Sequence, residues 1–282
     1  MRISVSTAVT CAREAVQDFR LYEYLPFGFI LATQLLFLIL ALNLAAPWGM
    51  ATVGWLAGSV GGDAVLHYPQ FFSFLSNLGA LVEAILYTLP GSFLIPLSIA
   101  RIMEPTDRAL QTPGTLMARV KRAAPPVLVG AILSTGVLAG WQYLLPVGPG
   151  PWVRMLAGGG IPGESAYWLL GMLVAYAIST CFLCIPIVAV QDGRGFGYSL
   201  IQGFKRSLAA FRFSYGYVVL FSLPALLTLY VTQVFGRLLV TQMRPEVSAV
   251  LLCVYAIFIN VGTYFLYGAT TRLLIAGKQE AE

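Results

Sequence analysis

Residues 166–190, AYWLLGMLVAYAISTCFLCIPIVAV, contain no Asp, Glu, Lys or Arg. A helix of about 20 residues crosses the hydrocarbon core of a bilayer, so this stretch is long enough to span a membrane. Five further apolar segments of similar length are residues 25–46, 71–99, 126–145, 213–235 and 248–271. Because 58% of the residues are hydrophobic and only 10% are charged, the composition excludes a soluble protein. We predict an all-α, polytopic membrane protein whose six transmembrane helices form one domain over residues 1–282.

The basic residues are divided unevenly between the two sides of these segments. Fourteen of the seventeen Lys and Arg residues fall on the side that holds both chain ends, and the other three are Arg154, Arg237 and Arg244. Since cytoplasmic loops retain Lys and Arg, we expect both termini in the cytoplasm and the protein in a bacterial inner membrane. Basic residues beside membrane ends attract anionic phospholipid headgroups, so the net charge of +5 indicates a lipid partner and not nucleic acid.

Three segments on the basic side combine an apolar stripe at helical spacing with a polar opposite face: residues 4–20, 112–122 and 196–212. This pattern predicts amphipathic helices in the membrane plane, with packing on the cytoplasmic ends of the spans as a compatible alternative. Each segment precedes an outward span, so the chain is predicted to form three hairpins that each follow an amphipathic helix. The apolar stripes are Val5, Val9, Ala12, Val16 and Phe19 in the first segment and Leu200, Ile201, Phe204, Leu208 and Phe211 in the last. The predicted surface for lipid headgroups or a partner consists of Lys121, Arg122, Lys205, Arg206 and Arg212.

Glu83 is the acidic residue that lies well inside a predicted span, and it is the main candidate for a functional side chain. An ionisable group at this depth usually faces the interior of the bundle or water. Asn77 lies on the same span and Asn260 lies midway along the sixth, where it would satisfy a protonated Glu83 if the two spans touch. A proton or cation relay is one interpretation. A neutral clamp between helices, or a carboxylate wetted from outside, is the other.

Small residues recur in the third and fourth spans. Gly136 and Gly140 form a GxxxG pattern, and Gly171 and Ala175 offer a matching surface on the next span. Small residues allow close approach of transmembrane helices, so this pattern predicts packing within the hairpin, or alternatively oligomerisation.

The second and fourth spans also contain prolines and a cysteine pair. Pro90, Pro96 and Pro186 predict kinks. Cys181 and Cys184 share a helix face, which would allow redox chemistry or metal binding, but no second ligand pair accompanies them. The alternative is that both cysteines are small apolar side chains in the core.

The outer connections carry only weak patterns. Asp63 and His67 are too few ligands for a metal, and the glycines of residues 158–163 lack the Lys and Ser/Thr of a phosphate-binding loop. Residues 47–70 are predicted to form an interfacial or re-entrant element. We therefore predict no catalytic residue, no metal and no cofactor.

The segment PIVAVQDGRG, residues 186–195, and the helix after it carry a family resemblance. The proline, the Asp192-Gly193 turn and the amphipathic helix resemble those of bacterial six-span proteins related to the membrane domain of glycerophosphoryl diester phosphodiesterases. The helix residues concerned are Ser199, Lys205, Arg206, Ser207 and Phe211. The resemblance implies a fold and a membrane setting but no activity, because those phosphodiesterases carry their catalytic residues in a separate soluble domain.

Two functional hypotheses follow. The first is a non-enzymatic accessory or scaffold subunit that packs against other membrane proteins, since the predicted interior has few ionisable groups and several small-residue faces. The second is a permease or lipid-handling transporter in which Glu83 and Asn260 lie in the bundle interior. An enzyme acting on lipid is less favoured, because no catalytic motif accompanies the spans.

Overall fold

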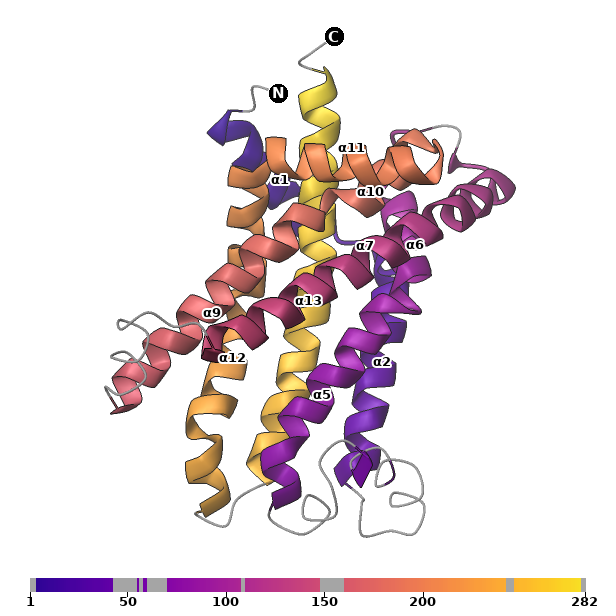
Figure 1. Cartoon of the computed structure of the whole chain (residues 1–282). Helices are drawn as coiled ribbons and strands as arrows, with labels where there is room; N and C mark the ends of the chain where they lie inside the picture. The colour runs from indigo at the N-terminus through magenta and orange to yellow at the C-terminus, as the bar shows by residue number, and fades with distance from the viewer. Residues whose placement is uncertain are drawn as a thin grey trace. The chain divides into compact units, whose positions relative to one another are not determined.

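A computed structural model describes residues 4–42, 55, 58–59, 70–107, 110–147, 160–241 and 246–279. In these ranges every regular element is a helix, which confirms the all-α class (Figure 1). The helices are α1 (Val5–Gln17), α2 (Leu21–Leu42), α5 (Gln70–Thr88), α6 (Gly91–Met103), α7 (Pro113–Val147), α9 (Gly160–Phe182), α10 (Cys184–Asp192), α11 (Phe196–Ala209), α12 (Phe211–Thr241) and α13 (Glu246–Gln279).

Five segments are helical, long and apolar enough to cross a membrane: Leu21–Leu40, Pro113–Gly140, Leu169–Asp192, Phe211–Thr232 and Ala249–Gly277. A sixth arises if Leu78–Thr88 and Gly91–Met103 form one span, which is bent by 59° at the break between them. Helices of this length and composition are those of a multi-pass membrane protein. Each of the six predicted spans overlaps one of these segments.

Prolines explain the two interrupted spans. Pro90 has no N–H to donate, so it cannot continue the hydrogen bonds of α5. The next helix, α6, begins here, and the Pro90 carbonyl accepts from the Leu94 N–H at 2.9 Å. In the fourth span, Pro186 removes the N–H that would bond to the carbonyl of Phe182, where α9 ends. The N–H of Cys184, at the start of α10, donates instead to the Ser207 hydroxyl at 2.9 Å. The predicted kinks at Pro90 and Pro186 are therefore breaks between separate helices.

The amphipathic helix predicted at residues 112–122 is wrong as a separate element. Residues 113–147 form one helix, α7, which continues through Pro125 and Pro126. Adjacent prolines remove two N–H donors within a single turn, and such losses are tolerated where neighbouring helices pack around the freed carbonyls. The predicted helices at 4–20 and 196–212 do exist as separate helices, α1 and α11.

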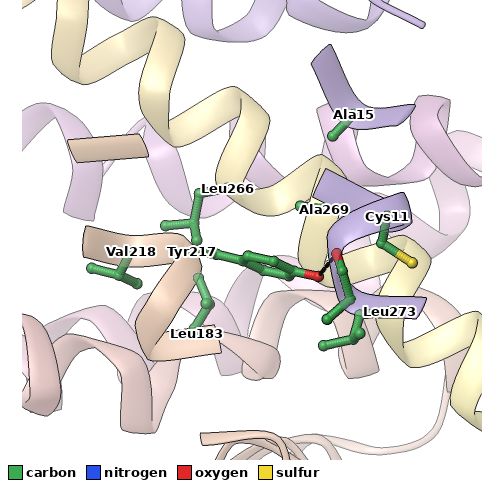
Figure 2. Packing of buried hydrophobic residues seen from close by; sticks show 9 residues of the cluster. Cys11, Ala15, Leu183, Tyr217, Val218, Leu266, Ala269 and Leu273 are labelled. Atoms are coloured by element: carbon green, nitrogen blue, oxygen red, sulfur yellow. Dashed lines mark hydrogen bonds between the residues drawn. The ribbon is translucent and has the colours of Figure 1, made fainter. Parts of the chain in front are cut away.

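The chain divides into two compact units. Unit 1 comprises Met1–Phe27, Tyr87–Phe221 and Thr263–Glu282, and unit 2 comprises Gly28–Leu86 and Ser222–Gly262. In unit 1, α1 packs by Ala8, Cys11 and Ala15 into an apolar cluster with residues of α12 and α13 (Figure 2). The Tyr217 hydroxyl of α12 points into this cluster and donates to the Ala8 carbonyl at 2.5 Å. Because that donor is buried, the bond fixes α1 to the bundle.

Candidate functional site

Glu83 is half-buried on α5, in unit 2. The Tyr255 hydroxyl of α13 donates to Glu83 Oε1 at 3.3 Å. A neutral phenol can donate to a carboxylate and also to the carbonyl oxygen of a protonated carboxyl group. The pair therefore joins α5 to α13 in either protonation state of Glu83.

Asn260 is fully buried, with 0% of its surface exposed, in the same unit. Its Nδ2 donates to Gln34 Oε1 at 2.6 Å and to the Ala256 carbonyl at 2.7 Å. The described hydrogen bonds thus pair Asn260 with Gln34 of α2, and Glu83 with Tyr255. Gln34 was not among the predicted residues, although an amide in the middle of an apolar segment is a signal for a partner across helices. The side chain of Asn77 lies outside the described residues.

A second acidic residue, which the sequence analysis missed, is buried in unit 1. Glu23 lies in the first turn of α2 and is 3% exposed. The Tyr264 hydroxyl donates to its Oε2 at 3.0 Å, and Arg20 Nε lies 3.9 Å from its Oε1. The sequence does carry a signal for this position: the acid directly precedes an apolar run and has a tyrosine on each side.

Aromatic rings surround the phenol that binds Glu23. The Tyr264 ring meets the rings of Phe19, Tyr24 and Phe27 edge-to-face, with centroids 5.5, 5.6 and 6.2 Å away. Aromatic pairs favour edge-to-face geometry, and such contacts add to the stabilisation that comes from burying the rings. The Tyr24 hydroxyl is buried and has no hydrogen-bond partner among the described residues. The cluster attaches the start of α2 to the C-terminal half of α13.

Helix α6 holds the backbone of the same turn of α2. The Ser98 hydroxyl donates to the Glu23 carbonyl at 2.6 Å, and the Arg101 guanidinium donates to the Tyr22 carbonyl. The first carbonyls of a helix accept a hydrogen bond from within the helix, so these side-chain donors bind to the second lone pair of each oxygen. Side-chain and backbone contacts together make this turn a junction of α2, α6 and α13.

Within unit 1, the fully buried residues of α1 and α11 are small, while much of each apolar stripe is exposed. In α1 the buried face is Ala8, Cys11 and Ala15, while Val5 and Val9 are 60% and 62% exposed. Burial raises the pKa of the Cys11 thiol, and the Glu14 carboxylate raises it further. The valines of the predicted stripe are thus exposed, whereas Ala12 packs beside the buried cluster and Phe19 contacts Tyr264.

The buried face of α11 consists of Ser199, Gly203 and Ser207. A Cβ atom added at Gly203 would lie 2.6 Å from the Ile185 Cα, so the backbones of α10 and α11 are in direct contact there. The hydrogen bond from the Cys184 N–H to Ser207 lies beside this contact. Glycine at residue 203 is required by the close approach of the two helices.

The predicted basic surface is divided by the structure. Arg206 turns inward, where its guanidinium donates to Gln191 Oε1 and Asp192 Oδ2, each at 3.0 Å. Lys205 and Arg212 are exposed, and the Arg212 guanidinium lies 4.7 Å from the centre of the Phe213 ring. Lys121 and Arg122 are also exposed, on α7. Arg206 is therefore a structural residue that joins α11 to the end of α10.

The GxxxG pattern of α7 is open. Gly136 and Gly140 are exposed, and a Cβ atom added at either position would meet nothing within 4 Å. Gly171 and Ala175 are half-buried on α9. By contrast, Gly130 is used within the chain, since its added Cβ would lie 3.1 Å from Ile185 Cδ1.

The described residues contain no group of three or more His, Cys, Asp or Glu side chains that could hold a metal ion. Cys181 and Cys184 are free thiols, and the Cys181 thiol donates to the Ala177 carbonyl at 3.4 Å. Asp63, His67 and the glycine-rich connection at 158–159 lie outside the described residues, as does nearly all of 47–70.

Compared with known proteins, the chain matches no family model, no curated protein and no solved structure. The resemblance of residues 186–211 to membrane domains of glycerophosphoryl diester phosphodiesterases therefore stays a prediction.

Proposed function

We propose that this chain is a non-enzymatic scaffold or accessory subunit that binds a transmembrane helix of another membrane protein. The observation that carries the proposal is the open face of α7 at Gly136 and Gly140, which no described residue covers. Paired glycines one turn apart let a second helix approach to backbone contact, which is the main source of helix association in lipid. Leu133 and Val137 border this face and are exposed as well.

The proposed setting is a bacterial inner membrane, with six spans in three hairpins and both termini in the cytoplasm. The five candidate spans, and the bent pair that forms a sixth, support this arrangement. Its orientation rests on the fourteen of seventeen basic residues that fall on one side of the spans. Anionic phospholipids and other membrane subunits are the proposed partners.

Two buried polar side chains support a scaffold because each is paired with another side chain. Asn260 is paired with Gln34 in unit 2, and Glu23 with Tyr264 in unit 1. Inside a membrane, such pairs hold helices together. Because these side chains already bind each other, the exposed surface is the part of the chain that is available for a partner.

The test replaces the glycines of the α7 face and measures recovery of a complex. Gly136→Leu with Gly140→Leu adds bulk where a partner helix would approach. The matched control is Thr135→Leu, which adds bulk at an exposed position on a different side of the same helix. After crosslinking in cells and extraction in a mild detergent, we expect the wild type and the control to migrate with a partner protein and the glycine variant to migrate alone.

Three results would contradict this proposal. The first is a wild-type chain that is crosslinked to no other protein and runs as a lone monomer. The second is a glycine variant that recovers as much complex as the control does. The third is recovery of the wild type only as a dimer of itself.

A second candidate function is a permease or lipid-handling transporter, and the half-buried Glu83 with its Tyr255 donor favours it. A carboxyl group within a span can carry a proton if it exchanges between two sides. In vesicles that contain a pH-sensitive dye, the wild type would then admit protons under an imposed potential, and Glu83→Gln would abolish that flux. Equal flux in both proteins would refute proton coupling through Glu83.

A further inference from the structure

Helix α11 connects two segments that are candidates for crossing the membrane. It follows Leu169–Asp192 and precedes Phe211–Thr232. In unit 1 it runs across the direction of the C-terminal part of α13 (Figure 1). Since both its ends are attached to the ends of spans, α11 lies within reach of the surface of one leaflet.

The side chains of α11 fall on three faces. At about 100° per residue, Ser199, Gly203 and Ser207 form the buried face against α10. Ile201, Phe204 and Leu208 form an apolar flank and are 58%, 39% and 50% exposed. In an amphipathic helix that packs on a bundle by its apolar face, these three side chains would be buried.

The other flank of α11 is polar and already in use. Gln202 and Arg206 lie there, and Arg206 is bound to Asp192. A helix held between spans with one apolar and one polar flank fits the boundary between acyl chains and water. The apolar flank would then face the acyl chains, and the polar flank would face the aqueous side.

Two exposed basic residues lie on α11 and directly after it. Lys205 lies next to the apolar flank, on the side opposite the buried face, and Arg212 follows in the first turn of α12. In the described part of the chain, no carboxylate pairs with either of them. We propose that α11 is an interfacial helix that binds anionic phospholipid headgroups of its leaflet through Lys205 and Arg212, with its apolar flank among the acyl chains.

The first experiment measures lipid preference. The purified chain is titrated with phosphatidylglycerol and phosphatidylcholine, and bound lipids are counted by native mass spectrometry. Each basic residue at a leaflet surface contributes about fivefold in affinity. We therefore expect Lys205→Gln with Arg212→Gln to lower the preference for phosphatidylglycerol at least about tenfold. Lys121→Gln with Arg122→Gln is the control, because it removes the same charge from α7.

An unchanged preference in the α11 variant would overturn the proposal. An equal loss in the α7 control would overturn it too, because the basic residues of α7 would then contribute as much as Lys205 and Arg212 and α11 would not be the specific binding helix. Lys205 and Arg212 are both exposed, so neither substitution is expected to disturb the fold.

The second experiment measures which flank the lipid covers. Ile201→Cys and Gln202→Cys are labelled with a membrane-impermeant maleimide in vesicles that contain phosphatidylglycerol, and the modified peptide is quantified by mass. Taken alone, the chain leaves Ile201 more exposed than Gln202. If lipid covers the apolar flank, the order reverses and position 201 reacts about tenfold more slowly. Equal labelling, or faster labelling at position 201, would refute an interfacial α11.

The two experiments do not depend on the partner helix proposed for α7. If the glycine variant of α7 still forms a complex, only the scaffold proposal fails. If lipid preference survives loss of Lys205 and Arg212, only the role of α11 fails.

Discussion

The close contact between α10 and α11 makes a sharp prediction for Gly203. A Cβ atom at this position would lie 2.6 Å from Ile185 Cα, 2.8 Å from its Cγ1 and 3.1 Å from its backbone nitrogen. Two of these three atoms belong to the backbone, so no change of rotamer relieves the contact. Gly203→Ala must therefore push the two helices apart or unfold the end of α11.

The magnitude follows from a comparison within the same helix. Gly197 is exposed and its added Cβ would meet nothing within 4 Å, so Gly197→Ala gains only helix propensity, up to about 1 kcal/mol. Gly203→Ala gains the same propensity but pays for overpacking, which costs about 1–3 kcal/mol where neighbours can adjust and more where they cannot. We expect the Gly203 variant to be less stable than the Gly197 variant by at least about 2 kcal/mol.

Thermal unfolding in one detergent, followed by intrinsic fluorescence, measures the difference. At about 2–4 °C per kcal/mol, the two variants should differ in Tm by at least about 4 °C. Addition of Ile185→Val to Gly203→Ala should not restore the Tm, because the nearest atom is the Cα and not the side chain. A Gly203→Ala protein as stable as the Gly197→Ala protein would refute direct contact between the backbones of α10 and α11.

Two further predictions concern the buried polar contacts. Tyr217→Phe removes the donor to the Ala8 carbonyl and should weaken the attachment of α1 by about 1–3 kcal/mol. Burial raises the pKa of the Cys11 thiol, so alkylation of Cys11 in the wild type should be slow at neutral pH and faster at higher pH. In the Tyr217→Phe variant the alkylation should be several-fold faster, and equal rates in the two proteins would contradict the docking of α1. For the amide pair, a double-mutant cycle of Gln34→Leu and Asn260→Leu should give a coupling of about 0.6–1.7 kcal/mol in unfolding free energy, and a coupling indistinguishable from zero would refute the pairing.

The sequence predicted the spans because hydrocarbon thickness sets their length, and the apolar runs show that length directly. It predicted α1 and α11 for a similar reason, since their periodicity is helical. It placed an amphipathic helix at residues 112–122 and a separate span at residues 126–145, and these two elements are one helix, α7. In α7 the helix continues through Pro125 and Pro126, so the local sequence pattern did not set where this helix ends.

The faces of α1 and α11 were harder to predict. Apolar periodicity identifies the face of a helix that is removed from water, and in a soluble protein that face packs on the core. Beside a bilayer, lipid can cover an apolar flank, so the bundle binds the narrow small-residue face instead. Ala8 and Gly203 are therefore more informative about packing than Val9 or Ile201, which the periodicity emphasised.

The candidate polar site shows a similar limit. Glu83 and Asn260 were found because each interrupts an apolar run, but the partner of each depends on which helices touch, and sequence alone does not provide that. Glu23 was missed because it lies at the boundary of its run, where a charge normally reaches water. In the folded chain Glu23 is only 3% exposed, and the Tyr264 hydroxyl donates to it.

Glycines form two close contacts between described helices. Gly203 packs on the backbone of Ile185, and Gly130 packs on the side chain of the same isoleucine. Because helices in lipid gain little from burying apolar surface against each other, positions without a bulky side chain decide where they meet. Gly136 and Gly140 have this same character but no neighbour among the described residues. The proposed partner helix therefore rests on this open pair of glycines, and the Gly136→Leu with Gly140→Leu variant tests it directly.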